Sequence, residues 1–178
     1  MLKDKFHWII ATGLGVGKIP FAPGTFGSLL AVWIWVIVNY YYFIFFNSFV
    51  ANLIMWLAII ISTFFIGIKS AEFYCNKYQK KDAGEVVIDE FCGQWIAIFI
   101  SCLSSGVIGY KMQTITKPYF ISILLSFILF RFFDIFKPWL IGKADKNVSG
   151  GLGVMLDDVL AGIFAGLTFV LFKIVFSF

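Results

Sequence analysis

Residues 134–162 read DIFKPWLIGKADKNVSGGLGVMLDDVLAG, and this polar stretch lies between two apolar segments, residues 118–136 and 159–178. The stretch holds four aspartates, three lysines and five glycines. Each flanking segment is about as long as a membrane-spanning helix, which needs roughly 20 apolar residues. The stretch is therefore predicted to lie at a membrane face, held between two membrane helices.

The composition of the whole chain agrees with a membrane protein. Of the 178 residues, 61% are hydrophobic and only 13% are charged, whereas a soluble domain is near half apolar and about a quarter charged. We expect an all-α, polytopic integral membrane bundle of about five membrane helices, with four as the alternative. The length fits a single membrane-embedded domain over residues 1–178. The start, MLKDKFHWII, lacks the plan of a signal peptide.

Five stretches are apolar enough for membrane helices, namely residues 28–46, 48–68, 91–110, 118–136 and 159–178. So little chain separates the first two that a tight helical hairpin is expected. The three cysteines, Cys75, Cys92 and Cys102, show no C-x-x-C spacing, so no disulfide framework is expected. Cys92 and Cys102 lie in or beside apolar runs and are most simply interpreted as small side chains that fill the core.

The placement of lysine and arginine predicts the orientation. With a cytoplasmic N-terminus, the cytoplasmic side receives Lys3, Lys5, Lys18, Lys69, Lys77, Lys80, Lys81, Arg131, Lys137, Lys143 and Lys146, and only Lys111 and Lys117 fall clearly outside. All ten acidic residues also fall on the cytoplasmic side. Acidic residues contribute little to topology, so we expect a shared polar site at that face.

The segment ATGLGVGKIPFAPGTFGS, residues 11–28, is rich in glycine and proline and is expected to be a structured loop. Its G-L-G-V-G string lacks the strand and βαβ unit of a dinucleotide-binding fold. Two interpretations stay open. The loop is either a backbone cradle for phosphate, with Thr25 and Ser28 as hydroxyl donors, or a tight turn in which one of them caps a helix.

Two clusters of ionisable residues lie at the ends of apolar segments. Asp89 and Glu90, in GEVVIDEFCGQW, stand at the entry to one segment. An exposed acid at a helix N-terminus is explained by the helix dipole, but an adjacent pair is explained less well. In FRFFDIFKP, Arg131, Asp134 and Lys137 fan over one helix face. Ionisable residues within a span are costly and indicate function by default; snorkelling of Arg131 beside a structural Asp134 is the alternative.

The last segment follows a glycine-rich approach at residues 149–153, expected to be flexible or tightly turned, and Asp157 and Asp158 are expected to open its helix. The two carboxylates would point about 100° apart on that helix, so one could bind a ligand while the other orients it. Further on, Gly162 and Gly166 form G-x-x-x-G, which favours close helix packing.

Carboxylates from three separate helix ends, without a histidine or thiolate cluster, predict a site for a hard cation. Magnesium prefers oxygen ligands, often completed by substrate phosphate. The predicted metal-binding and catalytic residues are Asp89, Glu90, Asp134, Asp157 and Asp158. Arg131, Lys137 and Lys143 would bind phosphate. Such a site at a membrane face suits a phosphorylated lipid headgroup whose acyl chains stay in the bilayer; no nucleic-acid partner is expected.

Four motifs, PGTFGS, DEFCGQW, FRFFDIFKPW and GGLGVMLDDVLAG, occur in this order, and the chain thereby resembles the bacterial phosphatidylglycerophosphatase A family from about residue 11 to 166. The resemblance implies a magnesium-dependent phosphatase of the bacterial inner membrane. Such an enzyme removes the terminal phosphate of phosphatidylglycerophosphate, in the synthesis of phosphatidylglycerol and cardiolipin. The positions that match the family pattern are Asp89, Glu90, Arg131, Asp134, Lys137, Asp157 and Asp158, with Asp145 and Asn147 in less defined roles.

Rival classes fit the residues less well. The only histidine is His7, which excludes mechanisms that need two, and the C-x5-R and D-x-D patterns of other phosphatases are absent. A CDP-alcohol-type headgroup transferase lacks its aspartate pattern, and a small multi-pass ion transporter would place its charges near the bilayer midplane. The residues leave the number of metal ions open, and they do not decide between attack by water and a covalent aspartyl-phosphate.

Overall fold

The computed structural model describes residues 2–46, 48–80, 83–107 and 117–176. Within this part all of the secondary structure is helical. The elements are α1 (Leu2–Ala11), a short 3-10 helix η1 (Val16–Lys18), α2 (Pro23–Phe45), α3 (Phe49–Tyr78), α4 (Ile88–Ser104), α5 (Lys117–Phe136), α6 (Leu140–Asn147) and α7 (Gly150–Phe176). The predicted all-α fold is confirmed for the described residues.

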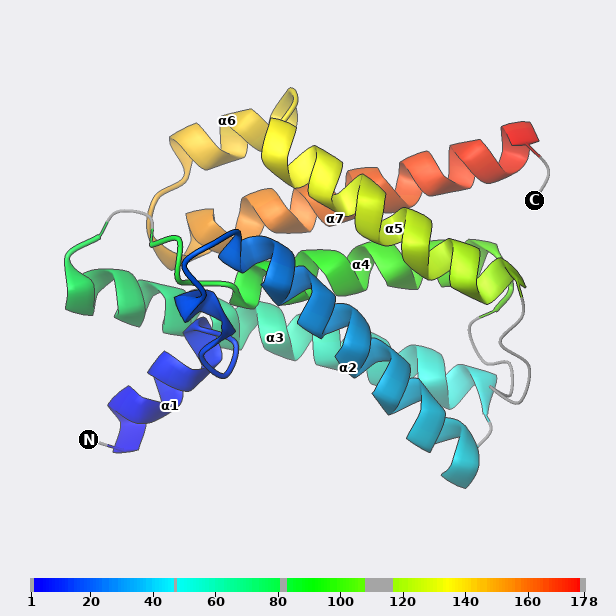
Figure 1. Ribbon diagram of the computed structural model, residues 1–178, viewed down its shortest axis with the longest axis horizontal. Coiled ribbons are helices and arrows are strands. Elements are labelled where there is room, and N and C mark those ends of the chain that lie inside the picture. Colours follow the sequence, from blue (N-terminus) through cyan, green and yellow to red (C-terminus); the bar gives the residue numbers. More distant parts are fainter. Residues whose placement is uncertain (1, 47, 81–82, 108–116, 177–178) are drawn as a thin grey trace.

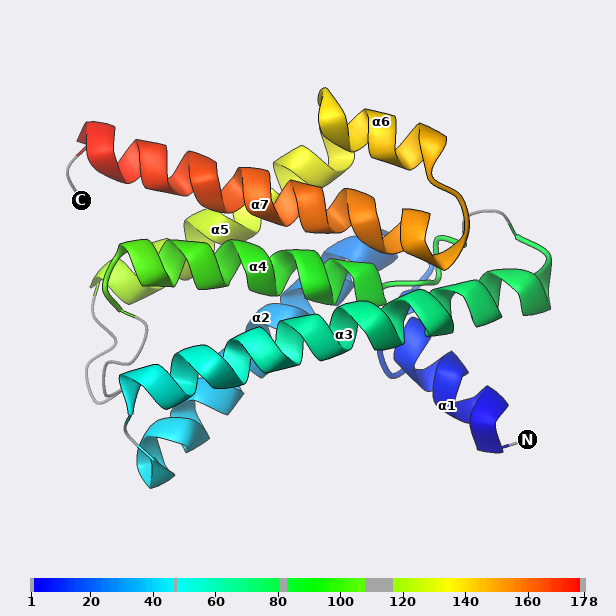
Figure 2. The same ribbon diagram turned by 180° about the vertical axis from the view of Figure 1, so that it is seen from behind.

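The helices α2, α3, α4, α5 and α7 run along the long axis of the molecule, each in the opposite direction to the one before it (Figure 1). The helix α4 lies at the centre and packs against α2, α3, α5 and α7, most extensively against α7. The view from behind shows α3 and α7 on either side of it (Figure 2). The N- and C-terminal ends of the chain lie at opposite ends of the bundle (Figure 1).

Four helices of the described part are long and apolar enough to cross a membrane, namely α2, α3, α5 and α7. The protein is therefore a polytopic membrane protein. The central helix α4 has 17 residues, which is about 25 Å at 1.5 Å per residue and shorter than a typical hydrocarbon core. It corresponds to the predicted span 91–110, of which residues 108–110 lie outside the described part. By length and composition four described helices qualify as spans, and the shorter α4 packs among them and runs along the same axis (Figure 1).

Several predicted boundaries are wrong, and packing explains the differences. The last helix begins at Gly150 and not near residue 159, because Gly151 and Gly153 are buried in its first turns and a Cβ at Gly151 would lie 2.0 Å from the Ile68 carbonyl oxygen of α3. This burial outweighs the low helix propensity of glycine. The predicted loop 11–28 is also shorter, since α2 begins at Pro23, a residue suited to a first helical turn.

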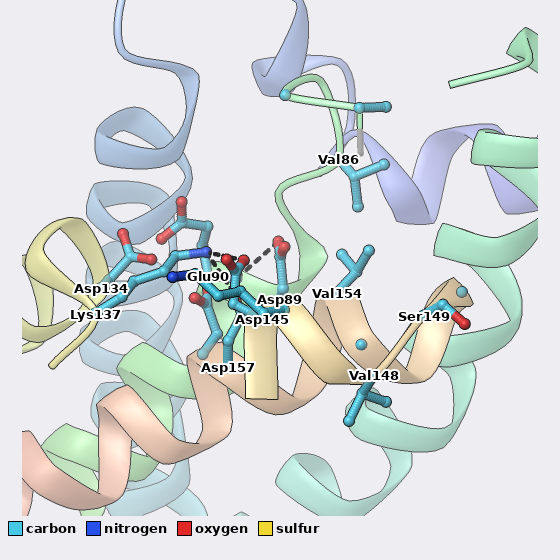
Figure 3. A pocket seen from close by; sticks show the side chains of 16 residues that line it. Val86, Asp89, Glu90, Asp134, Lys137, Asp145, Val148, Ser149, Val154 and Asp157 are labelled. Atoms are coloured by element: carbon cyan, nitrogen blue, oxygen red, sulfur yellow. Dashed lines mark hydrogen bonds and ion pairs between the residues drawn. The ribbon is translucent and has the colours of Figure 1, made fainter. Parts of the chain in front are cut away.

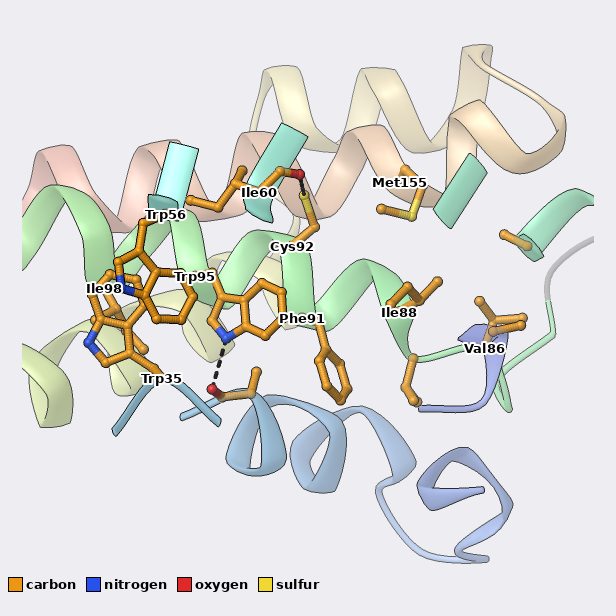
Figure 4. Packing of buried hydrophobic residues seen from close by; sticks show 14 of the residues in the cluster. Trp35, Trp56, Ile60, Val86, Ile88, Phe91, Cys92, Trp95, Ile98 and Met155 are labelled. Carbon is orange, nitrogen blue, oxygen red and sulfur yellow. Dashed lines mark hydrogen bonds between the residues drawn. The ribbon is translucent and has the colours of Figure 1, made fainter. Parts of the chain in front are cut away.

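The core contains stacked aromatic side chains where α2, α3 and α4 meet (Figure 4). The rings of Trp35 and Trp56 stack with centroids 3.8 Å apart, and the indole of Trp95 donates a hydrogen bond of 2.8 Å to the carbonyl oxygen of Ala31. Asn52 donates to Asn39 at 3.0 Å and ties the predicted α2–α3 hairpin together. All three cysteines are buried and none is in a disulfide, as expected.

Candidate active site

A cavity of about 460 Å³ opens among the start of α4, the end of α5, the short helix α6 and the first half of α7. Its ionisable lining residues are Asp89, Glu90, Asp134, Lys137, Asp145, Lys146, Asp157 and Asp158. Figure 3 shows the carboxylates gathered at one end of the cavity, while Val86, Val148, Ser149 and Val154 lie toward the other. The structure thus brings together all five carboxylates predicted from the sequence.

Three helices supply these carboxylates. Asp89 and Glu90 lie in the first turn of α4, where the positive end of the helix dipole favours negative charge. Asp134 lies in the last turn of α5. Asp157 and Asp158 lie within α7, about two turns from its start at Gly150, and not at its opening as predicted. Because α4, α5 and α7 pack against one another, residues far apart in the sequence meet at one point.

Three of the carboxylates form a compact cluster. One oxygen each from Glu90, Asp134 and Asp158 lies within 4.8 Å of the others. The side chains of Glu90 and Asp158 are buried, and the Asp158 Oδ2 atom is buried without a hydrogen-bond partner in the described part of the chain. A buried, unpaired carboxylate oxygen is costly. Oxygen donors at this spacing fit a hard divalent cation, which would satisfy that oxygen.

Lys137 links two further acids at the mouth of this cluster. Its Nζ atom donates to Asp145 Oδ1 and to Asp157 Oδ2, each at 2.6 Å. Burial of the ammonium group acts against its charge, but these hydrogen bonds and the two negative charges outweigh it and raise the pKa of Lys137 above its ordinary value. Lys137 therefore stays positively charged at neutral pH, beside the place where an anionic group would enter.

The backbone turns sharply to place Lys137. As predicted from Pro138, the helix α5 stops at Phe136. Lys137 has a φ of 41° and Trp139 a φ of 45°. Such positive values are strained for residues other than glycine, and strain of this kind gathers at functional sites. The turn sends α6 back over the cavity, so that Asp145 on α6 reaches Lys137.

Arg131 has a different position from Lys137. Its side chain is only 15% exposed, and it does not line the cavity. The Nη1 atom donates to Glu90 Oε2, forms an ion pair of 2.9 Å with Asp134 Oδ2, and donates to Ser28 Oγ at 3.2 Å. Arg131 thus contacts two of the three clustered carboxylates.

The other predicted phosphate-binding residues lie outside the cavity lining. Ser28 is buried, and its hydroxyl group donates to Glu90 Oε2 at 3.0 Å. Thr25 is partly exposed on α2, and Lys143 is exposed on α6. Neither Thr25 nor Ser28 caps α2, because the residue at the cap is Ala22. Roles for these residues in binding phosphate remain predictions.

The cavity also contains polar residues that the sequence reasoning did not select. Lys146 and Ser149 line it but were not predicted as site residues. Lys146 lies three residues beyond Lys143 in the same polar stretch, so composition could have suggested either lysine. Which of the two lysines lines the cavity depends on the direction of α6, and that direction depends on the turn at Pro138.

Comparison with known proteins places the chain in a family. Residues 9–173 match the sequence profile described as Phosphatidylglycerophosphatase A. A protein of Escherichia coli strain K12 named Phosphatidylglycerophosphatase A is 30% identical over 91% of this chain and 81% of its own length. A protein of the same name from Haemophilus influenzae is 32% identical over 88% of this chain and 82% of its own length.

A third relative has a different name. A protein of Bacteroides thetaiotaomicron named Putative phosphatidylinositol-3-phosphatase is 38% identical over 88% of this chain and 87% of its own length. No solved structure matches the chain. The names of the family and of its members describe phosphatases, which identifies the chain as a hydrolase of phosphoric monoesters and rules out the transporter and transferase alternatives. The chain belongs to the phosphatidylglycerophosphatase A family.

Proposed function

We propose that this enzyme removes the terminal phosphate of phosphatidylglycerophosphate, leaving phosphatidylglycerol and inorganic phosphate, as a step in the synthesis of phosphatidylglycerol and cardiolipin. The family membership and the two relatives of that name support this substrate. The observation that carries the proposal is the carboxylate cluster of Glu90, Asp134 and Asp158, which lies beside Lys137 in a cavity among membrane helices. A lipid headgroup can enter such a site while its acyl chains remain in the bilayer.

Mg²⁺ is the proposed cofactor, held by Glu90, Asp134 and Asp158, with Asp89 and Asp157 close enough to line the same cavity. Bound Mg²⁺ polarises a phosphoryl group and lowers the pKa of a coordinated water. The ammonium group of Lys137 would offset negative charge on the phosphoryl oxygens as the ester bond breaks. A carboxylate of the cavity would orient the attacking water or accept its proton. Attack by an aspartate, giving an aspartyl-phosphate, is the alternative route.

We also propose that the site faces the cytoplasm from the bacterial inner membrane. The start of α4, the end of α5, α6 and the N-terminal helix α1 lie toward the same end of the bundle (Figure 1), and these parts of α4 and α5 carry Asp89, Glu90 and Asp134. Most lysines of the sequence belong to segments at that end. Positively charged residues favour the cytoplasmic side of a bilayer, so this end is assigned to the cytoplasm.

The experiment is a phosphate-release assay on the purified, full-length protein in detergent. The panel contains phosphatidylglycerophosphate, phosphatidate, lysophosphatidate and phosphatidylinositol 3-phosphate, each with Mg²⁺, with EDTA, and with Mg²⁺ restored after EDTA. We expect the highest kcat/KM on phosphatidylglycerophosphate, loss of activity with EDTA and recovery with Mg²⁺. Full activity in EDTA would contradict the metal assignment.

Phosphatidylinositol 3-phosphate is the second candidate substrate, because the relative at 38% identity is named for it. Both lipids carry a phosphoric monoester on a headgroup that is joined to the lipid by a phosphodiester, so the same carboxylates could act on either. A higher kcat/KM on the inositol lipid than on phosphatidylglycerophosphate would replace our substrate assignment and leave the chemistry of the site unchanged.

A further inference from the structure

Arg131 contacts the carboxylate cluster on a side that does not form the cavity wall. One nitrogen, Nη1, contacts Glu90, Asp134 and Ser28, and the Arg131 Nε atom is buried without a hydrogen-bond partner in the described part. Neither Arg131 nor Ser28 lines the cavity. Nη1 is thus engaged by the two carboxylates, and moving it toward a phosphate would leave their charges buried and uncompensated.

The first turn of α2 packs on the same ion pair. A Cβ atom added at Gly24 would lie 1.9 Å from Glu90 Oε1 and 3.3 Å from Arg131 Nη1. Real Cβ atoms do not approach other atoms at 1.9 Å, so a larger residue at this position would displace the Glu90 carboxylate. Gly24 is also absent from the cavity lining. The segment PGTFGS, residues 23–28, therefore supports the Glu90–Arg131 pair through Gly24 and Ser28.

The carboxylates need such support because they repel one another. Glu90, Asp134 and Asp158 crowd together where burial strengthens the repulsion between their negative charges. The Nη1 atom of Arg131 contacts both Glu90 and Asp134 and offsets their negative charges. Groups that orient metal ligands without touching the metal affect metal affinity by about 10- to 100-fold in known metal sites.

We infer that Arg131 is a positioning residue: it holds the Glu90 and Asp134 carboxylates for a divalent cation, and Gly24 and Ser28 support it, so that this group acts on metal affinity and does not bind the substrate phosphate. The inference rests on the proposed function for the presence of the cation. It assigns the PGTFGS motif a role as a support for metal ligands, in place of a phosphate cradle.

The test compares Arg131→Lys, Gly24→Ala and Ser28→Ala with the wild-type protein, all full-length and in detergent. Mn²⁺ serves as the probe, and electron paramagnetic resonance of the free ion gives its Kd. Arg131→Lys keeps the charge but removes the guanidinium nitrogen that contacts both carboxylates, while Gly24→Ala changes no ionisable group. We expect both to raise the Kd for Mn²⁺ by about 10- to 100-fold. Ser28→Ala should raise it by about fivefold, the effect of one lost hydrogen bond.

A second readout separates metal binding from phosphate binding. With Mn²⁺ at saturation for each variant, we expect the KM for the lipid phosphate and the inhibition constant of inorganic phosphate to change by less than about threefold, within the effect of a single weak contact. Phe26→Leu is the matched control, because Phe26 lies in the same segment with an exposed side chain. The control should match the wild type in Mn²⁺ affinity. Circular dichroism and gel filtration check that each variant is folded.

Different results overturn different claims. Wild-type Mn²⁺ affinity in the variants, together with a raised KM and weaker inhibition by phosphate, would make Arg131 a phosphate ligand and overturn the inference. Failure of the wild-type protein itself to bind Mn²⁺ would instead contradict the metal assignment in the proposed function. Ser28→Ala removes a single hydroxyl group, so it keeps the inference falsifiable if the other two variants do not fold.

Discussion

Asp158 is the residue whose substitution is expected to lower catalytic activity most directly. Its carboxylate is buried, lies within the three-residue cluster, and has one oxygen without a partner in the described part. We expect Asp158→Asn to lower phosphate release by on the order of 10²- to 10³-fold, the usual effect of losing one electrostatic contact to the transition state. Helix content, measured by circular dichroism, should stay normal. Near-full turnover would show that Asp158 is not a ligand.

Lys137 offers a test of charge in the cavity. The residue lines the cavity, and its raised pKa keeps it charged. Lys137→Ala should reduce kcat by about 10²-fold, because a donor aimed at the developing charge is lost. Lys77→Ala is the matched control, since Lys77 is exposed at the end of α3 and its removal should change kcat by less than twofold. Equal effects of the two substitutions would argue against a role for Lys137.

Asp145 should act through Lys137. Its carboxylate accepts from Lys137 Nζ at 2.6 Å and is exposed, while Asp157 remains as a second partner of the lysine. Asp145→Ala should therefore cause an intermediate loss of kcat, about tenfold, smaller than that of Lys137→Ala. Steady-state kinetics with phosphatidylglycerophosphate measures both. Normal activity would confine Asp145 to a surface role.

At the scale of single residues, the sequence predicted the acidic side chains of the cavity but not the positions of all its basic side chains. Five carboxylates were selected because acids at the ends of apolar segments have no other strong explanation, and all five line the cavity. The position of Arg131 behind the carboxylates could not be predicted. Spacing along α5 fixes which residues share a face, but the side that faces the cavity depends on how α2 and α4 pack there.

Among the elements, the contact between α4 and α7 matters most for the site. A Cβ at Gly162 would lie 2.3 Å from the Gly93 carbonyl oxygen, and one at Gly93 would lie 2.5 Å from the Asp158 carbonyl oxygen. A Cβ at Gly166 would lie 2.6 Å from Ile100. The close packing predicted from the G-x-x-x-G spacing is thus confirmed. It sets the distance between Glu90 on α4 and Asp158 on α7.

This contact predicts an effect on stability. Gly162→Leu would force α4 and α7 apart, and overpacking of this kind costs about 1–3 kcal/mol. For a chain of this length we expect the melting temperature in detergent to fall by about 3–10 °C. Ile163→Leu is the control, because Ile163 is the next residue on α7 and is exposed; the melting temperature of this variant should not change. An unchanged value for Gly162→Leu would contradict the close contact.

Helix boundaries were the part of the fold least open to prediction. The glycines at residues 150–153 were expected to be flexible or tightly turned, but they allow α7 to approach α3, since a Cβ added at Gly151 would lie 2.0 Å from the Ile68 carbonyl oxygen. A tertiary contact of this kind has no local signal in the sequence. The end of α5 at Phe136 was predictable, because a proline two residues later limits a helix through its own backbone.

For the whole molecule, the path of the chain predicts five membrane crossings. Four described helices are long and apolar enough to span a membrane. The helix α4 also runs along the bundle, antiparallel to its neighbours α3 and α5 in the sequence (Figure 1). Counting α4, the chain crosses an odd number of times, and its two ends lie at opposite ends of the bundle. Without α4 as a crossing, both ends would lie on one side.

Reporter fusions decide between these arrangements. We expect a fluorescent protein fused before residue 2 to be fluorescent, because the distribution of lysine and arginine predicts a cytoplasmic location for that end. An alkaline phosphatase reporter fused after residue 176 should be active, because that end would be exported. The same reporter placed between α6 and α7 should be inactive, as the control. An inactive C-terminal fusion, with normal expression, would contradict five crossings.

The central claim is that carboxylates from α4, α5 and α7 meet around one divalent cation at the level of the lipid headgroups. Anomalous diffraction at the manganese edge, from crystals of the full-length protein grown with Mn²⁺, tests this most directly. The account predicts an anomalous peak in contact with oxygens of Glu90, Asp134 and Asp158. A peak at another site, with these three side chains turned away from one another in an active protein, would contradict it.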